Sequence, residues 1–167
     1  MTKILILLWT CLLVAGCGGK SQPPLNAQPP EVTSTGVVKA TPVATSINRG
    51  ESGDAIVRLK IQDGYHVNAN PASFSYLIAT ELTPAPAAGI SVDFINYPNG
   101  LTKKFSFNDE PLVVYEGETD IKVRLTAAKS AQAGEHNLSA KLRVQACDDQ
   151  VCYAPGTMEL TLPVAIK

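Results

Sequence analysis

The sequence predicts an all-β domain, and three observations lead to this fold class. Apolar and polar side chains alternate along several short stretches, which is the period of a half-buried strand. Turn-forming residues separate these stretches, and no segment has the apolar spacing of three and four that marks an amphipathic helix. Short strands joined by frequent turns are typical of a two-sheet sandwich, so we expect an immunoglobulin-like antiparallel β-sandwich.

The expected strands follow from this alternation. The clearest alternating stretches are 55–62, 121–125, 138–146 and 158–166, and weaker candidates are 36–47, 74–83, 90–96 and 111–116. Pro163 cannot donate a ladder hydrogen bond, so we expect the last strand to lie at a sheet edge. Two longer stretches, 64–75 and 98–111, fit a simple sandwich poorly. Long loops in compact domains are often functional.

The N-terminus has the pattern of an export signal. Lys3 precedes an apolar run from Ile4 to Ala15, which is too short for a permanent bilayer span of about 20 residues. The small residues before Cys17 resemble a bacterial lipobox, which implies cleavage after residue 16 and acylation of Cys17. The alternative is a soluble secreted protein that is cut nearby and keeps Cys17 as a free thiol.

We therefore expect a signal peptide at 1–16, a lipidated and Pro-rich tether at 17–31, and a folded domain at 32–167. In Gram-negative lipoproteins, a residue other than Asp after the cysteine implies release to the outer membrane. The expected location is the periplasmic face of the cell envelope, with the lipid as the sole membrane contact. Removing Lys3 from the 14 basic residues leaves 13 against 15 acidic ones, which argues against a nucleic-acid partner.

Signal cleavage and acylation would leave Cys147 and Cys152 to form a disulfide, which an oxidising compartment favours. One expected strand ends at Cys147 and another begins after Gly156, so the pair brackets a hairpin-like turn. In the chain-entropy model, a disulfide that closes such a short loop stabilises the folded state by roughly 2 kcal/mol, against about 4.7 kcal/mol for a 100-residue loop. A structural staple and a working redox pair both remain open at this point.

Metal and hydrolase chemistry fit the sequence less well. A Cys-x4-Cys pair supplies two zinc ligands where structural zinc needs four, and His66 and His136 are far away in the sequence. We therefore expect no metal and no cofactor. The hydrolase motifs Gly-x-Ser-x-Gly and His-Glu-x-x-His do not occur in the sequence. Asp148 and Asp149 are interpreted as a solvated turn whose charge disfavours Cys147 as the attacking thiolate.

Three segments, in this order, carry a family resemblance: residues 60–68, 97–100 and 145–155. They resemble the N-terminal periplasmic domain of the thiol:disulfide interchange protein DsbD, and the similarity extends over about residues 36–167. The resemblance implies an immunoglobulin-like fold and a protein-disulfide reductase component that needs no cofactor. Its cysteines would accept electrons from a membrane reductase and pass them to a periplasmic disulfide isomerase or thioredoxin-like protein.

The same resemblance implies roles for the two cysteines. Cys152 precedes an aromatic residue, Tyr153, and a nearby proline, so it is expected to face the partner, with Cys147 as the resolving thiol. Relatives place five residues between their cysteines, whereas this chain has four. The alternative function is a non-catalytic, immunoglobulin-like interaction lipoprotein in which the disulfide is structural.

Further site residues are implied in two segments. Relatives shield the disulfide with an aromatic side chain from a cap loop, for which residues 101–108 offer Phe105 or Phe107, although both could instead pack in the core. His66 and Asn68 fall where relatives line the site, and a histidine there can stabilise a thiolate or move its proton. The alternative for His66 is an ordinary surface or hydrogen-bonded histidine.

Two features depart from the family pattern. Lys103 and Lys104 stand in the loop where relatives carry acidic residues. The transmembrane and C-terminal thioredoxin domains of those relatives are also missing, so the chain is expected to act as a free-standing, tethered copy.

Overall fold

The computed structural model describes residues 31–167. The expected signal peptide, the acylated Cys17 and nearly all of the tether lie outside the described residues. Residues 32–167 form one unit, which is built from strands and turns. This part of the chain contains no helix long and apolar enough to cross a membrane.

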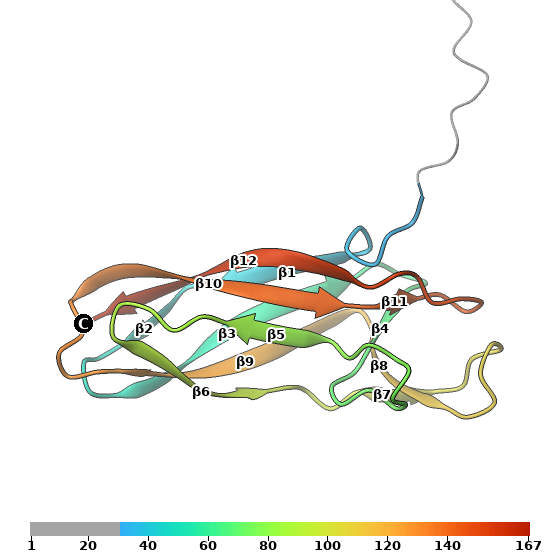
Figure 1. Ribbon diagram of the computed structural model, residues 1–167, viewed down its shortest axis with the longest axis horizontal. Coiled ribbons are helices and arrows are strands. Elements are labelled where there is room, and N and C mark those ends of the chain that lie inside the picture. The colour runs from blue at the N-terminus through green and yellow to red at the C-terminus, as the bar shows by residue number, and fades with distance from the viewer. Residues whose placement is uncertain (1–30) are drawn as a thin grey trace, which may run out of the picture. The chain divides into compact units, whose positions relative to one another are not determined.

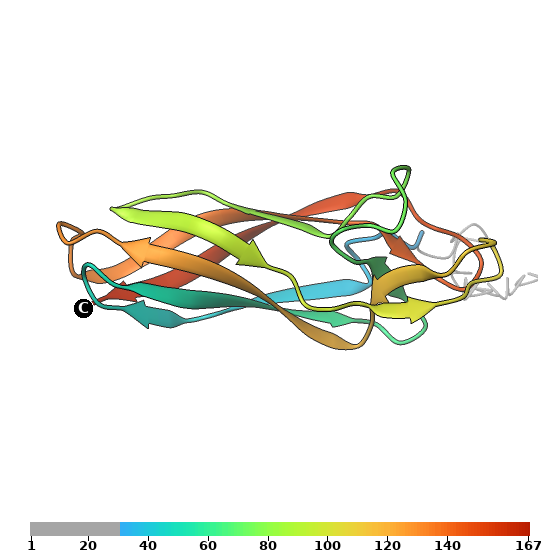
Figure 2. The same ribbon diagram turned by 90° about the horizontal axis from the view of Figure 1, so that it is seen from below.

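The strands form three four-stranded sheets (Figures 1 and 2). The first has the order β1 (Val38–Val43), β3 (Ser52–Ile61), β9 (Glu118–Ala127) and β6 (Ile90–Asn96). The second has the order β2 (Thr45–Ile47), β12 (Gly156–Ile166), β10 (Gly134–Val144) and β5 (Glu81–Pro84). The third has the order β11 (Ala146–Cys147), β4 (His66–Asn68), β8 (Leu112–Tyr115) and β7 (Leu101–Lys103).

The core lies between the inward faces of the two long sheets. Along most of β3, β9 and β10 every second residue is buried, including Val57, Leu59, Ile121, Val123, Leu138 and Leu142. Burial of each such aliphatic side chain contributes about 1.5–3 kcal/mol. Polar partners on the outward face stay in water, which explains why the alternation in the sequence located these strands. The all-β sandwich is therefore confirmed.

Two expected strands are corrected in detail. The stretch 36–47 is divided at Ala44, where the chain leaves β1 in the first sheet and enters β2 in the second. The stretch 74–83 is a strand only from Glu81 onward, so the prediction is wrong for 74–80. Side chains account for this, because Gln145 binds the backbone of this segment at Ile78 while Phe74 packs into a small separate cluster.

The expectation that the last strand is an edge strand is wrong at its C-terminal end. There β2 pairs in parallel with Val164–Ile166, while β10 pairs with the other side of β12. Pro163 itself precedes the pairing with β2, and its partner on the other side is Asn137. Because Pro163 lies outside the segment that pairs with β2, its missing N–H group costs no ladder hydrogen bond with β2.

The two long stretches that fit a simple sandwich poorly contain strands of the third sheet. β4 lies within 64–75 and β7 within 98–111, so residues 101–103 are not part of a loop and the loop begins at Lys104. The third sheet lies at one end of the sandwich, and the C-terminus lies at the other (Figure 1). Its small apolar cluster contains Phe105, Leu112 and Val114, with Phe74, Leu77 and Phe107 packed against them.

Candidate functional site

Cys147 and Cys152 form a disulfide across a tight hairpin at this end of the molecule, as the sequence predicts. Cys147 ends β11, and the two cysteines face each other as an antiparallel bridge with their Cα atoms 3.9 Å apart. Backbone hydrogen bonds close the turn from Asp148 N to Val151 O (3.0 Å) and from Tyr153 N to Ala146 O (2.8 Å). The hairpin therefore holds both sulfur atoms at one fixed place.

The two cysteines differ in their access to solvent. Cys147 has an exposed fraction of 0%, and the strand that it ends, β11, pairs with β4. Cys152, across the hairpin from Cys147, is partly exposed. A thiolate from outside can therefore reach Cys152 and not Cys147.

Asp148 organises the turn between the cysteines. Its Oδ1 accepts hydrogen bonds from the backbone N–H groups of Gln150 (2.7 Å) and Val151 (2.8 Å), and its Oδ2 accepts one from the Tyr153 hydroxyl (2.6 Å). The bond from Tyr153, followed by those two N–H groups, lowers the pKa of Asp148. The same contact with Asp148 raises the pKa of Tyr153 to about 12. Both aspartates lie in the turn, as expected: Asp149 is exposed, and Asp148 is partly exposed with its carboxylate hydrogen-bonded within the turn.

His66 lies directly beside the buried cysteine. It is the register partner of Cys147 in the antiparallel pair of β4 and β11, and only 1% of its surface is exposed. Its ring stacks on Phe105 with 4.0 Å between centroids and 20° between planes. Burial lowers the pKa of His66 below its ordinary value, so the imidazole is neutral at pH 7.

The segment expected to cap the disulfide lies against the hairpin. Phe105 is buried, and Phe107 is half-buried with its ring centroid 5.4 Å from that of Phe105. Between these two residues, Ser106 Oγ donates a hydrogen bond of 2.7 Å to the backbone carbonyl of Asp149. The loop is thus fastened to the hairpin by a single exposed hydrogen bond between these two elements, and Phe105 is part of the core cluster beneath it.

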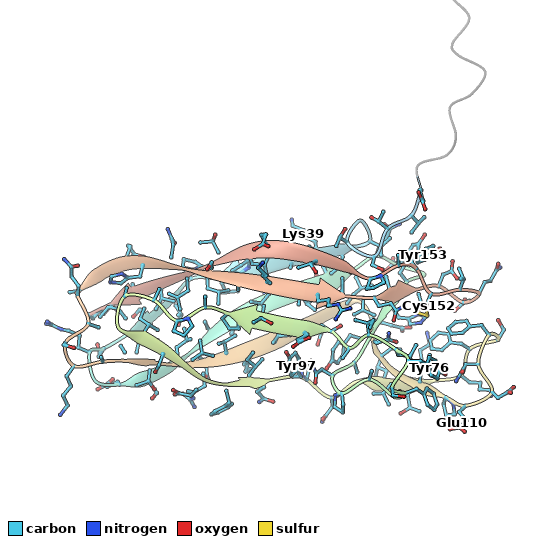
Figure 3. All side chains as sticks on the ribbon, in the orientation of Figure 1. Lys39, Tyr76, Tyr97, Glu110, Cys152 and Tyr153 are labelled. Atoms are coloured by element: carbon cyan, nitrogen blue, oxygen red, sulfur yellow. A yellow bond between two sulfur atoms is a disulfide. The ribbon has the colours of Figure 1, made fainter. Side chains whose placement is uncertain are left out.

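An apolar groove of about 320 Å³ runs beside Cys152. Its walls include Tyr76, Leu77, Phe107 and Val151, of which Tyr76 and Val151 are largely exposed. Figure 3 places Cys152, Tyr153 and Tyr76 at the same end of the molecule. The partly exposed sulfur therefore lies at the edge of an apolar surface.

Asn68 does not line the groove and instead belongs to a buried polar network. Its side-chain amide donates to Ile78 O (3.0 Å) and to Gln145 Oε1 (3.1 Å), and Gln145 Oε1 also accepts from Ile78 N (2.9 Å). Gln145 Nε2 reaches Tyr153 O at 3.3 Å. Gln145 thus connects β4, the 74–80 segment and the non-strand segment that follows Cys152. The sequence motif contained Gln145 two residues before Cys147, but nothing in the pattern indicated this role.

Ser34 is a second residue that sequence reasoning missed. Its buried hydroxyl accepts a hydrogen bond from Ala146 N (2.9 Å) and donates one to Ala154 O (2.6 Å). These two backbone groups flank the cysteine hairpin, so the first turn of the described chain supports the base of the site. Its distance in sequence from the cysteines left no local signal.

The two lysines of the cap region are both engaged. Lys103 forms an ion pair with Glu116, and its Nζ lies 5.7 Å from the centroid of the Phe105 ring. Lys104 donates to the backbone carbonyl of Asp109. No group of three or more His, Cys, Asp or Glu side chains suited to a metal ion occurs in residues 31–167.

Comparison with known proteins gives one family and one informative structure. The family model for the N-terminal part of thiol:disulfide interchange protein DsbD matches residues 35–163. The N-terminal periplasmic domain of ScsB from Proteus mirabilis superposes with a TM-score of 0.51 at 16% identity, covering 75% of this chain and 44% of that one. At this identity the superposition indicates the fold, and the chain spans less than half of that structure.

A second solved structure has a lower score. AggA, the major subunit of aggregative adherence fimbriae type I from Escherichia coli, has a TM-score of 0.38 at 10% identity, covering 78% of this chain and 95% of that one. No curated protein matches this sequence.

Proposed function

The chain belongs to the family of the N-terminal domain of thiol:disulfide interchange protein DsbD, and from this premise we propose that it is a periplasmic module that passes reducing equivalents through Cys147 and Cys152. It is tethered to the outer membrane by lipid on Cys17. Its electron donor is a membrane reductase, and its acceptors are periplasmic disulfide isomerases or thioredoxin-like proteins.

The exchange needs only sulfur chemistry. A thiolate of the donor attacks Cys152 Sγ, a mixed disulfide forms, and Cys147 leaves with the bonding electron pair and takes up a proton. The donor's second thiolate then attacks the donor sulfur that is bonded to Cys152. The two donor sulfurs become a disulfide, and Cys152 leaves as a thiolate. Two electrons have then moved onto the pair. The same steps in reverse reduce an acceptor disulfide.

The observation that carries this proposal is the difference in access between the two sulfurs. Cys152 is partly exposed at the edge of the apolar groove, whereas Cys147 is fully buried. A structural staple needs no such difference, but an exchange reaction needs one attackable sulfur and one that resolves. The expected roles of Cys152 as the partner-facing thiol and Cys147 as the resolving thiol agree with this geometry.

The first test is the reduction potential of the pair, measured in glutathione or dithiothreitol buffers. A potential between about −170 and −270 mV, within the range of disulfide oxidoreductases, supports exchange. A potential well below about −300 mV is typical of structural disulfides and would favour the non-catalytic interaction lipoprotein instead.

Trapping experiments then test the roles of the two thiols. Cys147→Ser leaves Cys152 free to attack but removes the resolving thiol, so it should accumulate mixed disulfides with periplasmic proteins. Cys152→Ser leaves only the buried Cys147 and serves as the matched control, which should trap little. Equal trapping by both variants would contradict the assigned roles.

A further inference from the structure

The buried imidazole of His66 is not explained by the exchange steps above. Its cross-strand partner is Cys147, and side chains of directly opposed antiparallel residues lie on the same face with Cβ atoms about 5 Å apart. Phe105 stacks on the ring and separates it from solvent. Among residues 31–167, no group forms a hydrogen bond with His66 Nε2, although this atom is buried.

A buried polar atom without a partner costs about 1–3 kcal/mol. That His66 Nε2 carries this cost beside a reacting sulfur points to a functional role for the imidazole. Cys147 must lose a proton each time it resolves a mixed disulfide, because the thiolate is the nucleophile. It is fully buried, so bulk water has no direct access to this proton in the resting protein. A proton acceptor inside the protein would remove this obstacle.

Among the titratable groups near Cys147, His66 is the one suited to accept its proton. Asp148 and Asp149 face it from the hairpin, Glu116 from the end of β8, and Lys103 from β7. The Asp148 carboxylate already accepts three hydrogen bonds, and Glu116 is paired with Lys103. Asp149 is exposed and belongs to the turn.

We propose that His66 accepts the proton of the Cys147 thiol when Cys147 resolves a mixed disulfide at Cys152, and returns the proton when the pair is reduced. The inference rests on the proposed exchange function and adds a proton path to it. It assigns the buried histidine to the resolving step and not to the first attack by Cys152.

The step balances in atoms and electrons. The proton of Cys147 Sγ passes to a neutral ring nitrogen of His66, and the thiolate attacks Cys152 Sγ in the mixed disulfide. The bond between Cys152 and the partner sulfur breaks, and the partner leaves as a thiolate with the electron pair. The Cys147–Cys152 bond forms, and the imidazolium of His66 releases its proton to that thiolate or to water.

Neutral imidazole suits this role because one of its two ring nitrogens is always an acceptor. Burial keeps His66 neutral at pH 7, so the base is in its active form throughout the neutral range. The rate of the resolving step should then level off above the pKa of His66. Without this base, the rate should instead keep rising with pH toward the ordinary thiol pKa of about 8.5.

The experiment uses oxidised glutathione as the partner disulfide and the reduced full-length protein. Acid quenching and mass spectrometry separate the formation of the glutathione adduct on Cys152 from its resolution by Cys147, at pH values from 5 to 9. In His66→Gln, we expect resolution at pH 7 to slow at least about 10-fold, with its rate rising with pH up to about 8.5. Formation of the adduct should change less than about twofold.

The matched control is His136→Gln, the same substitution at the start of β10. His136 binds the backbone of Gln132 near the end of the sandwich opposite the cysteines (Figure 1), and its loss should leave both steps unchanged. Equal resolution rates in His66→Gln and the wild type would overturn the inference and leave the proposed function intact. If the wild-type protein forms no adduct at all, the proposed function itself fails.

The wild-type protein supplies a second test that does not depend on folding of a variant. Its resolving rate should be level between about pH 7 and 8. A rate that instead climbs tenfold per pH unit over this interval would mean that Cys147 ionises without a protein base, and would overturn the inference.

Discussion

Ser106 and Asp149 join the two halves of the site, because the Ser106 hydroxyl donates a 2.7 Å hydrogen bond to the Asp149 carbonyl. This bond holds the loop after β7 against the cysteine hairpin and is exposed to water. The loop also carries Phe107, which forms one wall of the groove beside Cys152. We therefore expect this contact to influence how readily a reagent reaches the partly exposed Cys152.

Removing this contact should make the disulfide easier to reach. A hydrogen bond of this kind contributes about 0.5–1.5 kcal/mol, so Ser106→Ala should raise the population of the lifted loop about 2- to 10-fold. The rate of reduction of Cys147–Cys152 by dithiothreitol should rise by the same factor. Ser139→Ala, at an exposed position on β10, is the control. An unchanged rate in Ser106→Ala would show that the loop does not limit access.

The two phenylalanines of this loop should respond differently to truncation. Phe105→Ala removes a buried ring from the small cluster and should lower the free energy of unfolding by about 3–5 kcal/mol. Phe107 is only half-buried, so Phe107→Ala should cost less stability while still speeding reduction by dithiothreitol. Urea unfolding and stopped-flow reduction of both variants separate these effects. A larger loss of stability in Phe107→Ala would contradict the assignment of the two rings.

Gln145 should be a structural residue of the site. Gln145→Ala leaves the side-chain amide of Asn68 and the N–H group of Ile78 without this partner, and we expect a loss of about 1–3 kcal/mol in the free energy of unfolding. Urea denaturation with the disulfide intact measures this loss. Gln132→Ala, at an exposed position, should change stability by less than about 0.5 kcal/mol. Similar values for the two variants would mean that the network is not stabilising.

Asp148 should give the protein a pH-dependent contribution to stability. Its pKa in the folded protein is lowered, first by the bond from Tyr153, so its contribution is present above the unfolded pKa of 3.8 and is lost as pH falls through the folded value. Asp148→Asn should therefore destabilise the protein at pH 7, and the difference from wild type should shrink as pH falls below 3.8.

Denaturant unfolding at pH 7 and near pH 2.5 measures this difference. Asp149→Asn, the same change at the adjacent exposed residue, is the control. If the difference in the free energy of unfolding between wild type and Asp148→Asn stays constant over this pH range, the charge of the Asp148 carboxylate does not stabilise the hairpin.

The amino-acid sequence by itself determined the fold class and the place of the disulfide. Both depend on local patterns, because the period of two in stretches such as 138–146 decides which face of a strand is buried, and two cysteines at the base of a short turn are already close together. The strands β4 and β7 escaped detection because each is short and lacks a stretch long enough to show that period.

Only the tertiary structure decided what surrounds the sulfurs. His66 becomes a neighbour of Cys147 through the pairing of β4 with β11, and Ser34 reaches the same hairpin from the start of the domain. Such contacts join residues far apart in the chain, so no local periodicity can encode them. The difference in exposure between Cys147 and Cys152 has the same origin, because burial depends on what packs against each cysteine once the sheets assemble.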